Sequence, residues 1–285
     1  MMPSLPDMTT PNVDALAAER AAGQGAAAPV EMTPDLQVAL VEFLLRMGDN
    51  TLILGHRVSE WCGHSPVLEE DIALANTALD LIGQTQLWLG LAGEVEGQER
   101  TADNLAYLRD AAQFRNVLLV ERPNGDFGNT LMRQFLFDAW HHEMLTALQN
   151  STDPRVAEIA AKAIKEVAYH LERSADLVIR LGDGTEESHK RMQASLEDNW
   201  SYTGELFVSD DSDAAVAEAG IAPAPDSLRA GWDAVVNDVL DQATLKRPEG
   251  TYVHQGGKRG IHTEHLGYIL ADMQFLQRAY PGATW

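Results

Sequence analysis

Apolar residues recur at intervals of three and four along most of the chain, which is the period of a helix that buries one face. Thr33 followed by Pro34 predicts where the first helix begins, because threonine caps helix N-termini and proline suits the first helical position. The most regular stretch predicts six residues that face a helical core: Ile72, Ala75, Leu79, Ile82, Gln86 and Leu89.

Similar patterns predict helices along the rest of the chain, over about 33–61, 72–93, 101–114, 129–150, 153–181, 185–206, 227–245 and 263–279. No stretch alternates with period two for long enough to build a sheet. Gly182 is expected to end its helix in the left-handed conformation, and residues 210–225 are expected to form a polar surface loop. We therefore predict an all-α protein with one domain over 33–285, preceded by a disordered tail over 1–32.

Acidic and histidine side chains lie on four of the predicted helices, as the ligands of a di-iron bundle do. Ferritin-like di-iron proteins use one Glu from each of two helices and a Glu-x-x-His pair from each of the other two. The nearest equivalents here are Asp80-x-x-Gly83 and Glu166-x-x-Tyr169, and neither has an imidazole at that spacing. We interpret the chain as a ferritin-like antiparallel four-helix bundle with additional C-terminal helices and a vestigial position that holds no metal: Asp49, Asp80, Asp138, Glu166, Tyr169 and His170.

The histidines leave alternatives open. Glu166 and His170 are four residues apart and share a helix face, so they could bind a metal or form a buried polar pair bonded to Asp138 or His142. His141 and His142 are about 100° apart around a helix, so at most one of them faces the core.

Charge and composition restrict the partners. The chain has 285 residues with 21 Lys+Arg against 43 Asp+Glu, a net charge of −22, so we expect neither nucleic acid nor an anionic membrane as a partner. No apolar run reaches the roughly 18 residues that span a bilayer, and no secretory signal is apparent. The single cysteine, Cys62, is expected to be a small buried residue in a reducing compartment. We therefore expect a cytoplasmic protein.

Basic residues gather in a glycine-rich stretch near the C-terminus. Lys246, Arg247, Lys258 and Arg259 lie within 14 positions, and the second pair is flanked by Gly256, Gly257 and Gly260. One interpretation is a basic loop that docks on an acidic patch of this protein or of a partner. The other is an anion site, since glycines let the backbone approach a ligand and Thr263 begins a helix whose N-terminus favours negative charge.

Several long motifs occur in one order. They are Leu-Arg-Met-Gly-Asp-Asn at 45–50, Ser-Glu-Trp-Cys-Gly-His-Ser-Pro at 59–66, Leu-Asp-Leu-Ile-Gly-Gln at 79–84, Ala-Lys-Ala-Ile-Lys-Glu-Val-Ala-Tyr-His-Leu at 161–171, Arg-Leu-Gly-Asp-Gly-Thr at 180–185 and Gly-Gly-Lys-Arg-Gly-Ile-His-Thr-Glu-His-Leu-Gly at 256–267. With them, residues 38–285 resemble the structural subunits of phenylacetyl-CoA epoxidase, a ferritin-like family.

This resemblance implies a non-catalytic subunit of a bacterial monooxygenase that uses O2 and NADPH-derived electrons to convert phenylacetyl-CoA to its ring 1,2-epoxide. It implies that the di-iron centre lies in a homologous catalytic subunit, that a reductase delivers the electrons and that this chain needs no cofactor. It also implies acyl-CoA contacts at Gln113, Phe114, Arg115, Asn116, Asp213, Ala214 and Ala215.

Two rival functions stay open from the sequence. The chain could be a self-sufficient di-iron oxygenase with an atypical ligand set: Asp49, Asp80, Asp138, Glu166, His142 and His170. It could also be a helical binding protein unrelated to oxygenases.

Overall fold

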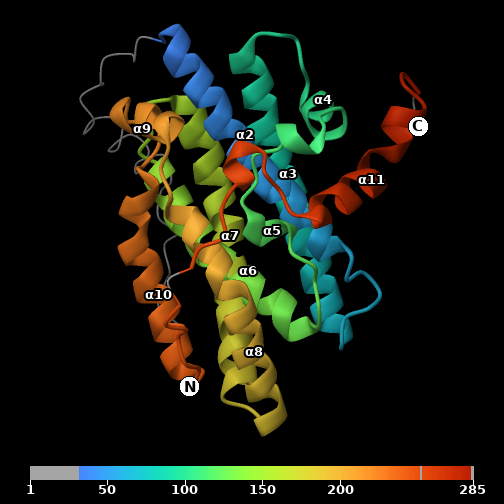
Figure 1. The fold of residues 1–285 in the computed structure, drawn as a ribbon, viewed down its shortest axis with the longest axis vertical. Helices are drawn as coiled ribbons and strands as arrows, with labels where there is room; N and C mark the ends of the chain where they lie inside the picture. Colours follow the sequence, from blue (N-terminus) through green and yellow to red (C-terminus); the bar gives the residue numbers. More distant parts are fainter. Residues whose placement is uncertain (1–31, 251, 284–285) are drawn as a thin grey trace, which may run out of the picture. The chain divides into compact units, whose positions relative to one another are not determined.

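The computed structural model of the chain describes residues 32–250 and 252–283. Within these ranges the backbone forms helices and connecting loops without a strand (Figure 1), which confirms the predicted all-α class. The tail predicted over 1–32 lies outside the described residues, apart from Met32, which precedes the first described helix.

The helices follow each other along the chain with loops of different lengths between them. The α-helices are α2 (Pro34–Ser59), α3 (Leu68–Glu96), α4 (Ala102–Tyr107), α5 (Leu118–Glu121), α6 (Phe127–Leu148), α7 (Pro154–Gly182), α8 (Glu186–Thr203), α9 (Asp211–Glu218), α10 (Arg229–Gln242) and α11 (Glu264–Ala279). The 3-10 helices are η1 (Ala111–Gln113), η2 (Gly204–Phe207), η3 (Pro225–Leu228) and η4 (Gly257–Arg259).

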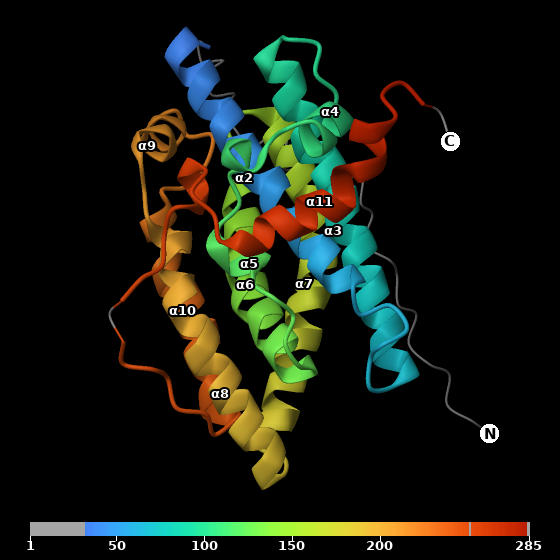
Figure 2. The ribbon, with the colours of Figure 1, turned by 45° about the vertical axis from the view of Figure 1, so that its right-hand side comes forward.

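The four longest described helices form two hairpins. Helix α2 packs along α3, α6 packs along α7, and α3 also contacts α7 (Figure 2). Helices α8 and α10 contact α6, α9 contacts α2, and α11 contacts α4. Large side chains such as Trp88 and Phe135 fill the space between the helices and are fully buried. This arrangement confirms the predicted four-helix bundle with additional C-terminal helices.

Local signals in the sequence set the helix starts. The Thr33 hydroxyl accepts the amide of Leu36 at 3.2 Å at the start of α2. The Asp153 carboxylate accepts the amide of Arg155 at 3.0 Å, with Pro154 as the first residue of α7. Each cap satisfies an amide that has no partner inside the helix.

The predicted core face of α3 is wrong at Ile72, Leu79 and Gln86, whereas Leu89 is fully buried as predicted. Ile72 and Leu79 are 53% and 69% exposed, whereas Leu74, Leu81 and Trp88 are buried. Apolar residues lie on both sides of this helix, so two stripes have helical spacing. The spacing alone does not decide which stripe faces the other helices.

Other local predictions also need correction. Gly182 is the last residue of α7 and not left-handed; a Cβ there would lie 2.6 Å from the carbonyl oxygen of Ala243, so the glycine permits close packing. The helix predicted over 101–114 is divided into α4 and η1, and the predicted loop over 210–225 contains α9. Cys62 is exposed.

None of the described helices combines the length and the apolar character needed to cross a lipid bilayer.

Candidate functional site

Polar side chains meet inside the bundle between α3, α6 and α7. The carboxylate of Asp138 on α6 is fully buried and accepts Gln134 Nε2 at 2.7 Å and the Ser174 hydroxyl at 3.0 Å. On α7, His170 Nε2 lies 2.9 Å from Asp80 Oδ2, and Glu166 accepts Gln84 Nε2 at 2.9 Å. Hydrogen bonds between side chains therefore connect α3 with α7 and α6 with α7.

Burial dominates the protonation of this polar core. Burial raises the pKa of Asp138 to about 6, although His170, Ser174 and Gln134 all favour its carboxylate. Burial also lowers the pKa of His141 to about 3, and the nearby His170 and His142 lower it further. His141 is the histidine of its pair that faces the core, and neither of its ring nitrogens has a hydrogen-bond partner.

The residues of the predicted vestigial metal position do not all come together. Asp49 forms a buried ion pair with Arg109 and takes no part in the polar core. Gly83 and Tyr169 are exposed, so histidines at these positions would point outward. Glu166 and His170 are expected from the sequence to bond to Asp138 or His142. They bond instead to side chains of α3, Glu166 to Gln84 and His170 to Asp80.

The polar core does not fit a di-iron centre. No three Asp, Glu, His or Cys side chains converge as metal ligands among residues 32–250 and 252–283. Both oxygens of Asp138 already accept hydrogen bonds, and His170 faces Asp80. Asp138, Glu166 and His170 are hydrogen-bonded to other groups of the chain, as most buried polar groups are, whereas His141 is not.

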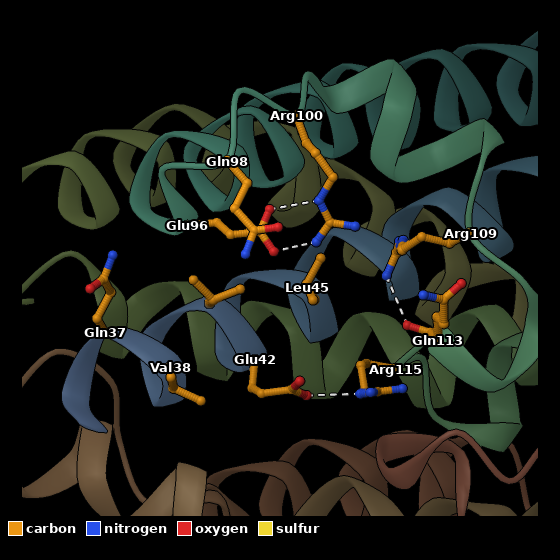
Figure 3. Close-up of a pocket in the computed structure, with 11 residues that line it drawn as sticks. Gln37, Val38, Glu42, Leu45, Glu96, Gln98, Arg100, Arg109, Gln113 and Arg115 are labelled. Carbon is orange, nitrogen blue, oxygen red and sulfur yellow. Dashed lines mark hydrogen bonds and ion pairs between the residues drawn. The ribbon is translucent and has the colours of Figure 1, made fainter. Parts of the chain in front are cut away.

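A cavity of about 380 Å³ lies beside two of the residues expected to contact acyl-CoA, Gln113 and Arg115. Its wall is formed by α2, the end of α3 and the segment that contains η1 (Figure 3). Arginines and carboxylates alternate around it. Arg115 Nε donates to Glu42 at 2.8 Å, and Arg100 Nε donates to Glu96 at 2.6 Å. The cavity therefore has a mixed lining, with guanidinium groups beside the apolar side chains of Val38, Val41 and Leu45.

The backbone of residues 109–118, here called the cavity segment, is held by polar groups of α2 and η2. Asp49 accepts the amide of Arg115, Asn50 accepts that of Val117, and Glu205 accepts that of Leu118, each at 2.8 Å. Phe114 and Asn116 are fully buried behind the cavity, whereas Arg115 faces it.

Sequence reasoning does not find these supporting residues. Asp49-Asn50 interrupts a buried apolar helix, which is a signal that both side chains need partners. The partners lie more than 50 residues away, and a helical pattern does not identify them.

The second expected contact group, Asp213 to Ala215, lies on α9 and outside this cavity. Asp213 is buried and accepts Arg46 Nη1 at 2.8 Å, and it also pairs with Lys258. Glu42, which pairs with Arg115 at the cavity, and Arg46, which pairs with Asp213, are one turn apart on α2. The two expected contact groups are therefore bound to neighbouring side chains of the same helix. Arg46 also pairs with Asp210 at 2.6 Å, so two cations face two carboxylates here.

The four basic residues near the C-terminus do not form one patch. Arg247 pairs with Asp233 at 2.8 Å and lies over the Trp200 ring at 4.8 Å. Lys258 pairs with Asp213 and donates to the carbonyl of Val208 at 2.7 Å. Lys246 and Arg259 are exposed. Arg247 and Lys258 therefore dock against acidic groups of this same chain.

Comparison with known proteins agrees with the sequence motifs. A family model described as phenylacetic acid catabolic protein matches residues 9–285. The chain belongs to this family. It is also 50% identical over 246 residues to a subunit of the 1,2-phenylacetyl-CoA epoxidase of Escherichia coli (strain K12). The aligned region covers 86% of this chain and 99% of that relative, so the resemblance inferred from the motifs is confirmed.

The shifted pKa of Asp138 predicts a pH-dependent stability. Folding raises this pKa from 3.8 to about 6, so the ionised carboxylate opposes folding, and its cost grows as pH rises from about 4 to about 6. Asp138→Asn keeps the size and removes the charge. We expect it to raise the free energy of unfolding by about 1–3 kcal/mol at about pH 8 and to change little at about pH 4.

Urea unfolding at the two pH values measures this difference. Asp176→Asn, on the exposed side of the same bundle, is the matched control and should have little effect at either pH. A wild type and an Asp138→Asn variant of equal stability at about pH 8 would contradict the assigned shift.

Proposed function

We propose that this chain is a non-catalytic structural subunit of a multicomponent phenylacetyl-CoA 1,2-epoxidase that works in the cytoplasm. The observation that carries the proposal is the 50% identity to a subunit of such an epoxidase, over 99% of the relative's length. A subunit works with other subunits. The partners proposed here are a homologous di-iron catalytic subunit and a reductase component, with phenylacetyl-CoA as the substrate.

The donor groups of the polar core support the non-catalytic role. A di-iron centre needs four carboxylates and two imidazoles that point at one place. In this chain Asp49 is paired with Arg109, and Asp138 accepts hydrogen bonds from Gln134 and Ser174. The same placement argues against the rival self-sufficient oxygenase, because its proposed ligands are divided between two regions.

The cavity beside Gln113 and Arg115 supports a contact with the acyl-CoA. Its guanidinium groups suit phosphate, which arginine binds through two parallel hydrogen bonds. Arg115 is 21% exposed at its side chain and its ion-pair partner Glu42 is 27% exposed, so the pair is accessible from the cavity. The pair is half-buried, so a phosphate that binds Arg115 Nε takes the place of the Glu42 carboxylate.

Iron content tests the non-catalytic role. The purified chain, incubated with ferrous iron and then dialysed, should retain no stoichiometric iron, because Asp49 is paired with Arg109 and Asp138 is bonded to Gln134 and Ser174. The homologous catalytic subunit, treated in the same way, is the positive control. Elemental analysis that finds about two irons per chain in this subunit would contradict the proposal.

Substitution of Arg115 tests the acyl-CoA contact. Arg115→Gln should weaken the binding of phenylacetyl-CoA to the assembled complex about tenfold, since a hydrogen bond to a charged group is lost. Arg180→Gln is the matched control, because Arg180 is an exposed arginine on α7 that pairs with Asp176 outside the cavity. Titration calorimetry measures both, and equal affinities for Arg115→Gln and wild type would remove Arg115 from the contact.

A further inference from the structure

The glycine-rich stretch over 256–263 packs against the backbone of the cavity segment. A Cβ on Gly257 would lie 2.1 Å from the carbonyl oxygen of Asn116, and a Cβ on Gly260 would lie 2.1 Å from that of Ala112. Gly260 also has a φ of +76°, which favours glycine. The glycines therefore permit contact between two backbones, and the stretch leads directly from this contact into α11.

The side chain of His262, near the end of this stretch, is buried between two acceptors. Its Nδ1 lies 2.8 Å from Glu121 Oε2, and its Nε2 lies 3.0 Å from the carbonyl oxygen of Phe114. A carbonyl oxygen accepts hydrogen bonds and does not donate them. The Glu121 carboxylate accepts two further bonds, from Asn116 Nδ2 at 2.9 Å and from the amide of Thr263 at 2.6 Å. With Glu121 ionised, both ring nitrogens of His262 donate, so the ring is an imidazolium.

The surrounding charges favour this imidazolium. Burial alone lowers the pKa of His262, but the hydrogen bond and the charge of Glu121, the Phe114 carbonyl and the charge of Asp49 raise it above its ordinary value. Of the cations packed on the same region, Arg115 shares an acceptor with His262, because its Nη1 donates to the Phe114 carbonyl at 3.0 Å, whereas two others are engaged elsewhere. Arg109 pairs with Asp49, and Arg57 Nη2 donates to the backbone carbonyl of Glu121 at 2.9 Å.

The bonds of His262 and Glu121 converge on residues 114–116. His262 holds the carbonyl of Phe114, and Glu121 holds the side chain of Asn116. Arg115, which faces the cavity, lies between these two anchors. On the other side, Asp49 holds the amide of Arg115. We call His262 and Glu121 with these bonds the His262 clamp.

We propose that protonated His262 is a positioning residue, which fixes Arg115 at the cavity through the His262 clamp and thereby makes acyl-CoA binding depend on pH. The dependence on acyl-CoA rests on the proposed function of the cavity. The clamp itself rests on the geometry of His262, Glu121 and Phe114 alone.

The sign of the pH effect follows from the direction of the shift. Folding raises the pKa of His262, so the clamp is complete below the ordinary histidine value of about 6.5 and weakens as pH rises through the raised value. A neutral ring donates from one nitrogen only. Either the Phe114 carbonyl or the Glu121 carboxylate then loses its hydrogen bond to His262. The carbonyl keeps the bond from Arg115 Nη1 and the carboxylate keeps those from Asn116 and Thr263, so residues 114–116 are held by one bond fewer.

Amide hydrogen exchange of the full-length chain tests the clamp. We expect protection of the cavity segment to fall as pH rises from about 6 to about 9 in the wild type. In His262→Gln, protection should be lower by about tenfold at about pH 6 and show no such transition. Glu121→Gln removes the charge that raises the pKa of His262, so its transition should move to lower pH. His265→Gln, three residues along on α11, should behave as the wild type.

Phenylacetyl-CoA affinity of the assembled complex tests the positioning role. It should fall about tenfold over the same pH range in the wild type and in His265→Gln, and be low and independent of pH in His262→Gln. Equal exchange in His262→Gln and wild type overturns the clamp. Altered exchange with unchanged affinity in His262→Gln overturns the positioning role, provided that Arg115→Gln weakens binding. Unchanged affinity in Arg115→Gln instead marks failure of the proposed acyl-CoA contact, and this inference falls with it.

Discussion

The buried ion pair between Asp49 and Arg109 is the interaction on which the cavity and its surroundings depend. Burying a single carboxylate costs several kcal/mol unless it is paired, and removing one partner of a buried pair costs about 3–5 kcal/mol. Asp49 is fully buried in α2 and also accepts the amide of Arg115. Arg109 in turn donates to the carbonyl of Gln113 at 3.0 Å. The pair therefore fixes where the cavity segment crosses α2, and with it the direction of Arg115 and the place of Phe114 beside His262.

The polar core of the bundle has a different basis. There Asp138 bonds to the amide of Gln134 on its own helix and to the hydroxyl of Ser174 on α7, and His170 on α7 bonds to Asp80 on α3. These contacts connect α6 and α7 without an ion. Their cost is visible in the raised pKa of Asp138 and the lowered pKa of His141, both of which burial causes. Such a network specifies how the helices pack more than it stabilises them.

Features that depend on residues close together in the sequence, such as helix starts, can be predicted from the sequence. Features that depend on contacts with distant residues, such as buried faces and ion-pair partners, cannot. The starts of α2, α7 and α8 follow from caps at Thr33, Asp153 and Thr185, which act within three residues. The predicted core face of α3 is wrong because both sides of that helix are apolar. The sequence pattern places Asp49 at a metal position because its partner Arg109 is 60 residues away. It places Asp213 in a surface loop because the cations that permit its burial, Arg46 and Lys258, lie on other parts of the chain.

The central claim is that this chain supports an epoxidase without taking part in its chemistry. The most direct measurement is phenylacetyl-CoA epoxidation by the complex of this chain with the proposed catalytic subunit and reductase, with Asp138→Asn and His170→Gln combined in this chain. Both residues belong to the polar core and lie outside the cavity wall. If the claim holds, turnover per assembled complex stays within about twofold of the wild type. A loss of about a hundredfold or more in an intact complex, the size expected for removal of a catalytic acid or base, would contradict it.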